Sequence, residues 1–151
     1  RRQQCNRGRV MAGGGSAPVQ VDLPARDGHR WRGGLSVCDD LRFPELFRAH
    51  ARAAADLLLV PSAFTHVTGQ AHWEVLLRAR AIENLAYVVA PAQGGVHENG
   101  RHTWGQCLVA DPWGQVLAQQ AQGPGVVLAD LDPERLRSVR QQLPALTHRV
   151  L

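Results

Sequence analysis

Hydrophobic positions along this chain recur with two different periods, and each period predicts a different kind of element. Residues 19–23 alternate between apolar and polar side chains, as in a half-buried strand, and turn residues follow at 24–28. Apolar side chains recur at helical spacing over about residues 70–84, which predicts a long helix. Pro44, a residue tolerated in the first turn of a helix, predicts another helix that ends near Ala55.

Short apolar runs predict further strands, and two pairs of them are joined by turn signals. The dipeptide Asn99-Gly100 favours a tight hairpin turn, and residues 111–114 predict a second hairpin. This order of elements predicts an α+β fold, with a mixed sheet and helices on one face. The predicted strands are 35–38, 57–60, 87–90, 106–110, 116–118 and 126–130, and a short helix runs from Pro133 to about residue 142.

Residues 1–16 differ from the rest of the chain because they consist largely of Arg, Gln and Gly and show no hydrophobic period. We interpret them as a poorly ordered arm. The remaining residues, 17–151, are enough for one domain, since 44% of the 151 residues are hydrophobic. The chain does not begin with Met, which we interpret as the sign of a fragment or a processed product.

The chain is basic, with a formal charge of +4, and all 17 of its basic residues are arginine. Most of these arginines are dispersed among acidic residues, and no basic run is interleaved with aromatic residues as in single-strand binders. No nucleic-acid partner is therefore predicted. The alternative, a nucleic-acid-binding arm, rests on Arg1, Arg2, Arg7 and Arg9 alone, and salt-dependent binding lost on deleting residues 1–16 would reveal it.

The cysteine count argues for a reducing compartment. Cys5, Cys38 and Cys107 are odd in number and contain no C-x-x-C pair, which argues against a disulfide framework and a zinc site. The predicted location is therefore the cytoplasm. No apolar stretch approaches the roughly 20 residues of a membrane helix, so no membrane partner is predicted. The spacing of the histidines matches no ligand motif, and neither a metal nor another cofactor is predicted.

Cys38 is the candidate nucleophile, because it ends a predicted strand just before a predicted helix. Such a junction leaves backbone N–H groups free, here those of Asp39 and Asp40, to stabilise a developing oxyanion. The alternative is that Cys38 is a small buried hydrophobic residue, because free cysteine is among the most buried residue types.

Several segments together resemble the carbon–nitrogen hydrolase, or nitrilase, superfamily. The run GLSVCDDLRFPEL over residues 34–46 is similar to the family's nucleophile motif, and residues 69–84 to its long second-half helix. The family's hairpin region is similar to the segments 100–105 and 111–114. The closing segment, 143–149, is also similar to the family. The resemblance covers about residues 18–151, and the subgroup it favours is the deaminated-glutathione, or nitrilase-like, amidases.

The resemblance implies the C-terminal half of a nitrilase-type α-β-β-α sandwich, with a mixed sheet and flanking helices. It also implies that Cys38 attacks the carbonyl of a small linear amide, forms a thioester and releases ammonia. The family's glutamate base and its lysine lie upstream of the cysteine, and this chain contains no lysine. Asp39 stands where the family usually has tyrosine.

The substrate and oxyanion residues implied by the resemblance are Asp39, Arg42, His72 and Glu74. Each has a structural alternative. Arg42 is predicted to form an ion pair with Asp40 or Glu45 if it does not contact a substrate carboxylate. Glu74, like Glu83, is predicted to pair with arginines of the same helix, Arg78 and Arg80.

Two functions remain open at this point. One is an amidase that is incomplete in this chain and acts on small linear amides, which the resemblance implies to be of the deaminated-glutathione type. The other is a truncated, inactive domain that acts only by assembly with a partner. Half of a sandwich exposes apolar sheet surface, so we expect a homo-oligomer or association with the upstream half of the same fold.

Overall fold

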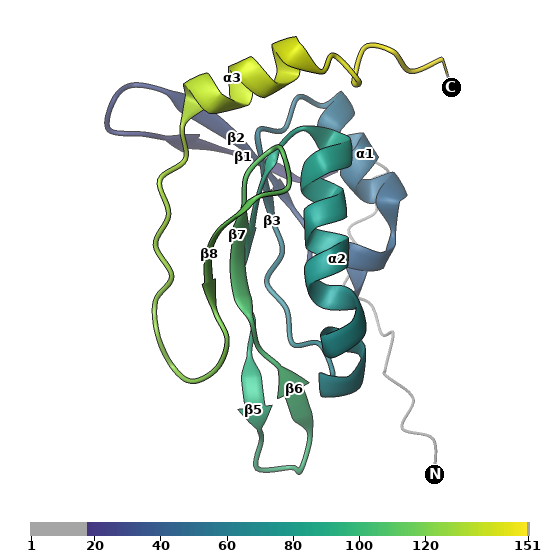
Figure 1. Cartoon of the computed structure of the whole chain (residues 1–151), viewed down its shortest axis with the longest axis vertical. Coiled ribbons are helices and arrows are strands. Elements are labelled where there is room, and N and C mark those ends of the chain that lie inside the picture. Colours follow the sequence, from purple (N-terminus) through teal and green to yellow (C-terminus); the bar gives the residue numbers. More distant parts are fainter. Residues whose placement is uncertain (1–17, 151) are drawn as a thin grey trace.

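The computed structural model describes residues 18–150, whose helices and strands are shown in Figure 1. Six strands form one sheet in the order β1-β2-β3-β4-β7-β8. They are β1 (Gln20–Pro24), β2 (Arg30–Leu35), β3 (Leu57–Leu59), β4 (Tyr87–Ala90), β7 (Cys107–Ala110) and β8 (Val116–Gln120). The other elements are the 3₁₀ helix η1 (Cys38–Arg42), the helices α1 (Pro44–Arg52), α2 (His66–Asn84) and α3 (Pro133–Gln142), and a separate hairpin of β5 (Gly94–Val96) and β6 (His102–Trp104). The predicted arm, 1–16, lies outside the described residues.

The sheet is mixed, as predicted. Strands β2, β3 and β4 are parallel, and α1 and α2 make the connections between them. Strand β1 forms an antiparallel hairpin with β2, and β7 and β8 extend the other edge in antiparallel pairs. The three parallel strands therefore end at the same edge of the sheet, and the segments that follow them meet there.

The core has two parts, one on each face of the sheet. On one face, α1 and α2 cover the strands, and Phe47, Leu77 and Trp73 pack with Leu58 and Val88. Side chains alternate between faces along a strand, so the neighbouring residues Leu57 and Tyr87 point to the other face, where they pack with Leu136 of α3. The prediction of helices on one face is therefore wrong for α3, which lies at one end of the molecule (Figure 1).

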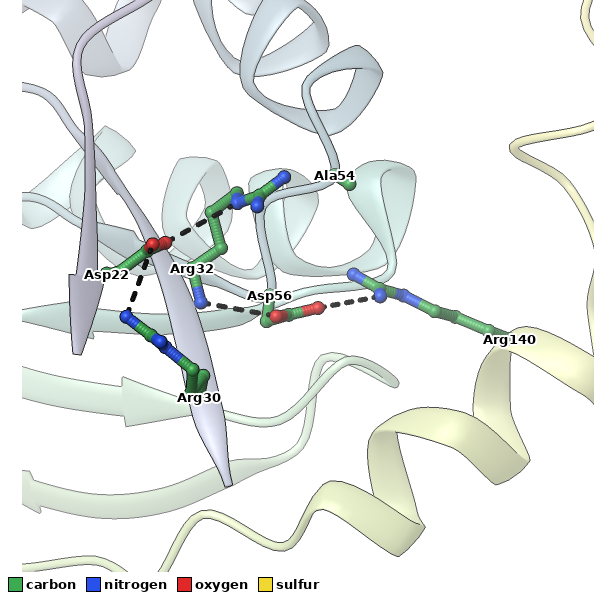
Figure 2. Close-up of a pocket in the computed structure, with 6 residues that line it drawn as sticks. All are labelled: Asp22, Arg30, Arg32, Ala54, Asp56 and Arg140. Carbon is green, nitrogen blue, oxygen red and sulfur yellow. Dashed lines mark hydrogen bonds and ion pairs between the residues drawn. The ribbon is translucent and has the colours of Figure 1, made fainter. Parts of the chain in front are cut away.

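Helix α3 is held to the sheet by Arg140, as Figure 2 shows. Its guanidinium donates to the Asp56 carboxylate (2.8 Å) and to the backbone carbonyls of Ala55 (2.8 Å) and Leu85 (3.0 Å). Asp56 immediately precedes β3, so one side chain joins the C-terminal helix to the start of a central strand. Apolar periodicity contains no information about this contact.

Two predicted strands are wrong in position or existence. Strand β2 runs from Arg30 to Leu35 rather than over 35–38. It was misplaced because it contains Gly33 and Gly34, and glycine is a poor strand former. Gly34 lies against the His50 ring, which leaves no room for a Cβ. The segment 126–130 is not a strand: Val126 and Leu128 are 82% and 83% exposed, and the segment pairs with no strand among residues 18–150.

The predicted helices are present with shifted ends. Helix α2 begins at His66, four residues before the predicted start, because Gly69 interrupts the helical signal of its first turn. Helix α1 ends at Arg52, three residues before the predicted end. Both predicted hairpins are confirmed, with Gly100 and Gly114 in turns at positive φ.

Candidate functional site

Cys38 lies directly beyond the carboxyl end of β2, at the edge where the parallel strands end. The backbone N–H of Ser36 bonds to Leu59, and that of Cys38 bonds to the carbonyl oxygen of Pro61 (2.9 Å), which follows β3. The N–H of Ser62 in turn bonds to Pro91, beyond β4. This backbone ladder places the thiol where open α/β sheets bind ligands, at the carboxyl ends of parallel strands.

The backbone of Cys38 is strained. Its φ is +50°, in the left-handed region that residues with a side chain rarely occupy. Asp40 stabilises the turn, because its carboxylate accepts a hydrogen bond from the backbone N–H of Val37 (2.8 Å). The side chain of Cys38 is partly buried and packs against the larger core cluster.

The two predicted oxyanion donors differ in the structure. The backbone N–H of Asp40 already donates to the carbonyl oxygen of Val37 (3.0 Å), so it is not available to a ligand. The N–H of Asp39 has no acceptor among residues 18–150. Only the Asp39 N–H therefore remains as a candidate donor in this turn.

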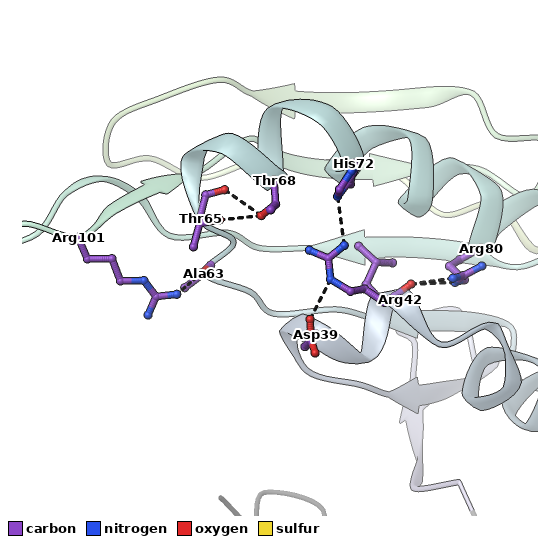
Figure 3. Close-up of polar contacts among 9 residues, drawn as sticks. Asp39, Arg42, Ala63, Thr65, Thr68, His72, Arg80 and Arg101 are labelled. Carbon is purple, nitrogen blue, oxygen red and sulfur yellow. Dashed lines mark hydrogen bonds and ion pairs between the residues drawn. The ribbon is translucent and has the colours of Figure 1, made fainter. Parts of the chain in front are cut away.

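Asp39 and Arg42 of η1 come together with His72 of α2 (Figure 3). Nε of Arg42 donates to the Asp39 carboxylate (2.9 Å), and Nη1 lies 3.1 Å from Nδ1 of His72. A guanidinium only donates, so Nδ1 of His72 is the acceptor in this contact. The Arg42 guanidinium also lies over the Phe64 ring, 4.9 Å from its centroid.

The ion pair of Arg42 corrects the sequence prediction, which named Asp40 or Glu45 as its partner. Asp39 is the partner instead, three residues before Arg42 on η1. The carboxylate that follows Cys38 in the sequence is thus paired with an arginine.

Glu74 does not join this cluster. Its carboxylate lies 3.6 Å from Arg78, one helical turn further along α2, and both side chains are about half exposed. Glu83 likewise pairs with Arg80 at 2.9 Å. Both contacts agree with the structural alternatives predicted from the sequence.

Arg80 is a positioning residue that the sequence analysis missed. Its side chain is nearly buried, and Nε and Nη2 both donate to the carbonyl oxygen of Leu41 in η1 (3.1 and 2.8 Å). Its guanidinium lies over the Phe47 ring, 5.2 Å from the centroid. Helix α2 thereby holds the 3₁₀ turn that begins with Cys38. The available signal was the position of Arg80 on the core side of α2, between Leu77 and Ala81.

His50 holds the end of β2, the strand that leads into this turn, and sequence reasoning missed it as well. Its ring is fully buried; Nε2 donates to the carbonyl oxygen of Leu35 (3.0 Å), whereas Nδ1 has no partner in the described part of the chain. Burial lowers the pKa of His50 from its usual 6.5, and the bond to Leu35 and the charge of Asp40 oppose this shift.

The other histidines do not converge on a metal. The rings of His66 and His102 stack with centroids 4.0 Å apart, and Nε2 of His97 lies 2.7 Å from the Thr103 hydroxyl. Over residues 18–150, no three His, Cys, Asp or Glu side chains are arranged to hold a metal ion. In the same range, no helix is long and apolar enough to span a membrane.

Comparison with known proteins identifies relatives of this chain. Residues 3–141 match the carbon-nitrogen hydrolase family. The deaminated glutathione amidase of Synechocystis sp. (strain PCC 6803 / GT-S) is 56% identical over 117 residues, which are 78% of this chain and 43% of that protein.

Solved structures share the fold. The Caenorhabditis elegans NitFhit protein matches with a TM-score of 0.81 and 44% identity, over 90% of this chain and 32% of that one. A mutant amidase of Nesterenkonia sp. AN1 matches with a TM-score of 0.69 and 30% identity, over 90% and 46%. That amidase carries the acetamide moiety of fluoroacetamide covalently at its active-site cysteine. The chain thus spans less than half the length of these relatives.

Proposed function

Because the chain belongs to the carbon-nitrogen hydrolase family, we propose that it supplies the nucleophile of an amidase, Cys38. The observation that carries this proposal is the strained backbone of Cys38 at the carboxyl edge of the parallel strands, beside the free N–H of Asp39. Strained backbone of this kind clusters at functional sites, and it persists only where the surrounding structure holds it in place. Here Arg80 holds η1 at Leu41, and His50 holds the end of β2 at Leu35.

The proposed reaction has two steps. The Cys38 thiol gives up its proton and the sulfur attacks the amide carbonyl carbon, while the oxygen takes the negative charge near the Asp39 N–H. The C–N bond then breaks, the thioester forms, and the nitrogen leaves as ammonia with the proton that the thiol gave up. Water then attacks the thioester, releasing the carboxylic acid and restoring the thiol. In the family, the glutamate base and the lysine both lie upstream of the cysteine, and this chain contains no lysine.

We propose a small linear amide that carries a carboxylate as the substrate, of the deaminated-glutathione type. Two observations support it: the name of the Synechocystis relative, and the Arg42 guanidinium, which binds the Asp39 carboxylate and contacts Nδ1 of His72. Asp39 in this arrangement occupies the site that an incoming carboxylate would take. His72 keeps the guanidinium oriented. Glu74, which pairs with Arg78, takes no part in this arrangement.

The missing partner in this proposal is the upstream half of the same fold, or a second copy of the chain. Its support is apolar surface on the segment 126–130, where Val126 and Leu128 are more than four-fifths exposed. We also propose a cytoplasmic setting, because Cys38 and Cys107 are free thiols and a nucleophilic thiol needs a reducing compartment.

A second function is favoured by one observation, the absence of lysine from all 151 residues. Without a cation to stabilise the tetrahedral intermediate, the domain would bind its partner and catalyse nothing. The two functions make opposite predictions for a single experiment.

That experiment measures ammonia release from small carboxylate-bearing amides, with mass detection of an acyl adduct on Cys38. Cys107→Ala is the matched control for Cys38→Ala, because Cys107 is also a partly buried free thiol but lies within β7. With the upstream half of a relative added, we expect turnover and adduct for the parent chain and for Cys107→Ala, and neither for Cys38→Ala.

The outcomes separate the two functions. Turnover that depends on Cys38 excludes the inactive domain, and turnover by this chain alone would also require that another group replace the lysine. A folded chain that forms neither adduct nor ammonia, alone or with the upstream half of a relative added, contradicts the amidase proposal.

A further inference from the structure

A charged pocket lies at the edge of the sheet opposite Cys38 and η1. Cys38 follows the carboxyl end of β2, whereas this pocket surrounds Arg30, the first residue of β2, and Asp56, which precedes β3 (Figure 2). Its volume of about 520 Å³ is within the range of small-molecule sites. The lining residues are Asp22, Arg30, Arg32, Ala54, Asp56 and Arg140.

One arginine of the pocket is already committed to the fold. Arg140 donates to Asp56 at 2.8 Å and to two backbone carbonyls, and both charged side chains are mostly buried, with 29% and 18% exposed. Asp56 also accepts the backbone N–H of Arg32 (3.2 Å). This pair is therefore a fixed, electrically neutral wall of the pocket.

The other two arginines are poorly satisfied. Arg30 and Arg32 share the single carboxylate of Asp22 at 3.9 and 3.6 Å, which are ion-pair distances but too long for hydrogen bonds. The only other side-chain contact of Arg32 in residues 18–150 is a long hydrogen bond to the Ala53 carbonyl (3.4 Å). Two guanidiniums thus present unused donors around one acceptor.

The charges of the lining residues do not balance. Three arginines face two aspartates, so the pocket has a net charge of +1. Guanidinium groups bind carboxylate and phosphate oxygens through paired, charge-assisted hydrogen bonds, and Arg30 and Arg32 project from the same side of one strand. We propose that this pocket binds the oxyanion group of a small carboxylate or phosphate ligand, between Arg30 and Arg32.

The test measures binding of inorganic phosphate and of succinate to the full chain by calorimetry, at constant ionic strength set with chloride. The Nε–H resonances of the arginines report the site of binding by NMR. Arg32→Gln removes the net charge, and we expect about tenfold weaker binding. Asp22→Asn removes the competing acceptor, and we expect tighter binding. Arg101→Gln, on the β5–β6 hairpin, is the matched control and should bind as the parent does.

Arg32→Gln is expected to weaken binding and Asp22→Asn to tighten it. A variant that merely loses its folded structure cannot bind more tightly, so the second variant distinguishes the proposal from misfolding. Preference for phosphate or for succinate identifies which oxyanion the pocket takes, and either supports the proposal. The proposal is overturned if neither anion gives saturable binding, or if Arg32→Gln and Asp22→Asn both bind as the parent does.

Discussion

His50 connects the protonation of one buried side chain to the stability of the chain. Its pKa in the folded state lies below the usual 6.5 because the ring is buried. The unfolded chain therefore takes up this proton first as the pH falls, and the free energy of unfolding decreases from pH about 6.5 down through the folded pKa. Above that window, the contribution of His50 does not change with pH.

We predict that His50→Gln has a flatter stability profile than the parent chain between pH 7.5 and 5.5. Urea unfolding followed by circular dichroism at several pH values measures it. His148→Gln, which removes an exposed histidine, is expected to keep the parent profile. A parent profile retained in His50→Gln would mean that other groups cause the pH dependence.

At single positions, sequence reasoning was most informative where the local chain determines the outcome. The hairpin turns at Gly100 and Gly114 and the helical pairs of Glu74 and Glu83 followed from neighbours in sequence. The partner of Arg42 was wrong because Asp39, Asp40 and Glu45 are all within reach in sequence, and only the backbone of η1 decides among them.

Among the elements, η1 depends most on a distant residue. Arg80 of α2 gives two hydrogen bonds to Leu41, 39 residues earlier, and one to Glu83. Removal of a buried guanidinium leaves a carbonyl and a carboxylate without their partner, which is among the more destabilising kinds of substitution.

We predict that Arg80→Met lowers the free energy of unfolding by about 3 kcal/mol and changes the rate at which iodoacetamide alkylates Cys38. Arg78→Met, at a half-exposed position on the same helix, should cost about 1 kcal/mol or less. Urea titration and mass-resolved alkylation measure the two effects. Equal losses in both variants would show that Arg80 has no special role in holding the turn.

Elements were predicted well where periodicity was unbroken and poorly where long-range pairing decided. Strands β3 and β4 follow directly from their apolar runs. Strand β2 was misplaced because its glycines are explained only by close approach of other groups, such as the His50 ring at Gly34. The segment 126–130 has a strand's composition, but composition cannot supply the neighbouring strand that it requires.

At the scale of the whole molecule, we predict association through the segment 126–130. Replacing Val126 and Leu128 with Asp should weaken association at least about tenfold, because apolar surface is replaced by charge. Sedimentation velocity over a range of concentrations, with and without an upstream half, measures this. Gln119→Asp with Gln122→Asp adds the same charge at exposed polar positions and should associate normally. Equal weakening in both would indicate a general charge effect.

The left-handed conformation of Cys38 has a consequence for how this chain can be altered. Glycine is the residue that accepts such a backbone without penalty, and any other side chain costs on the order of 1 kcal/mol there. An engineer who optimised the chain for heat resistance alone would write glycine at position 38, and would delete the thiol in doing so. The residue that favours stability and the proposed nucleophile therefore differ at this position, so thermostabilised variants should be chosen with position 38 held fixed.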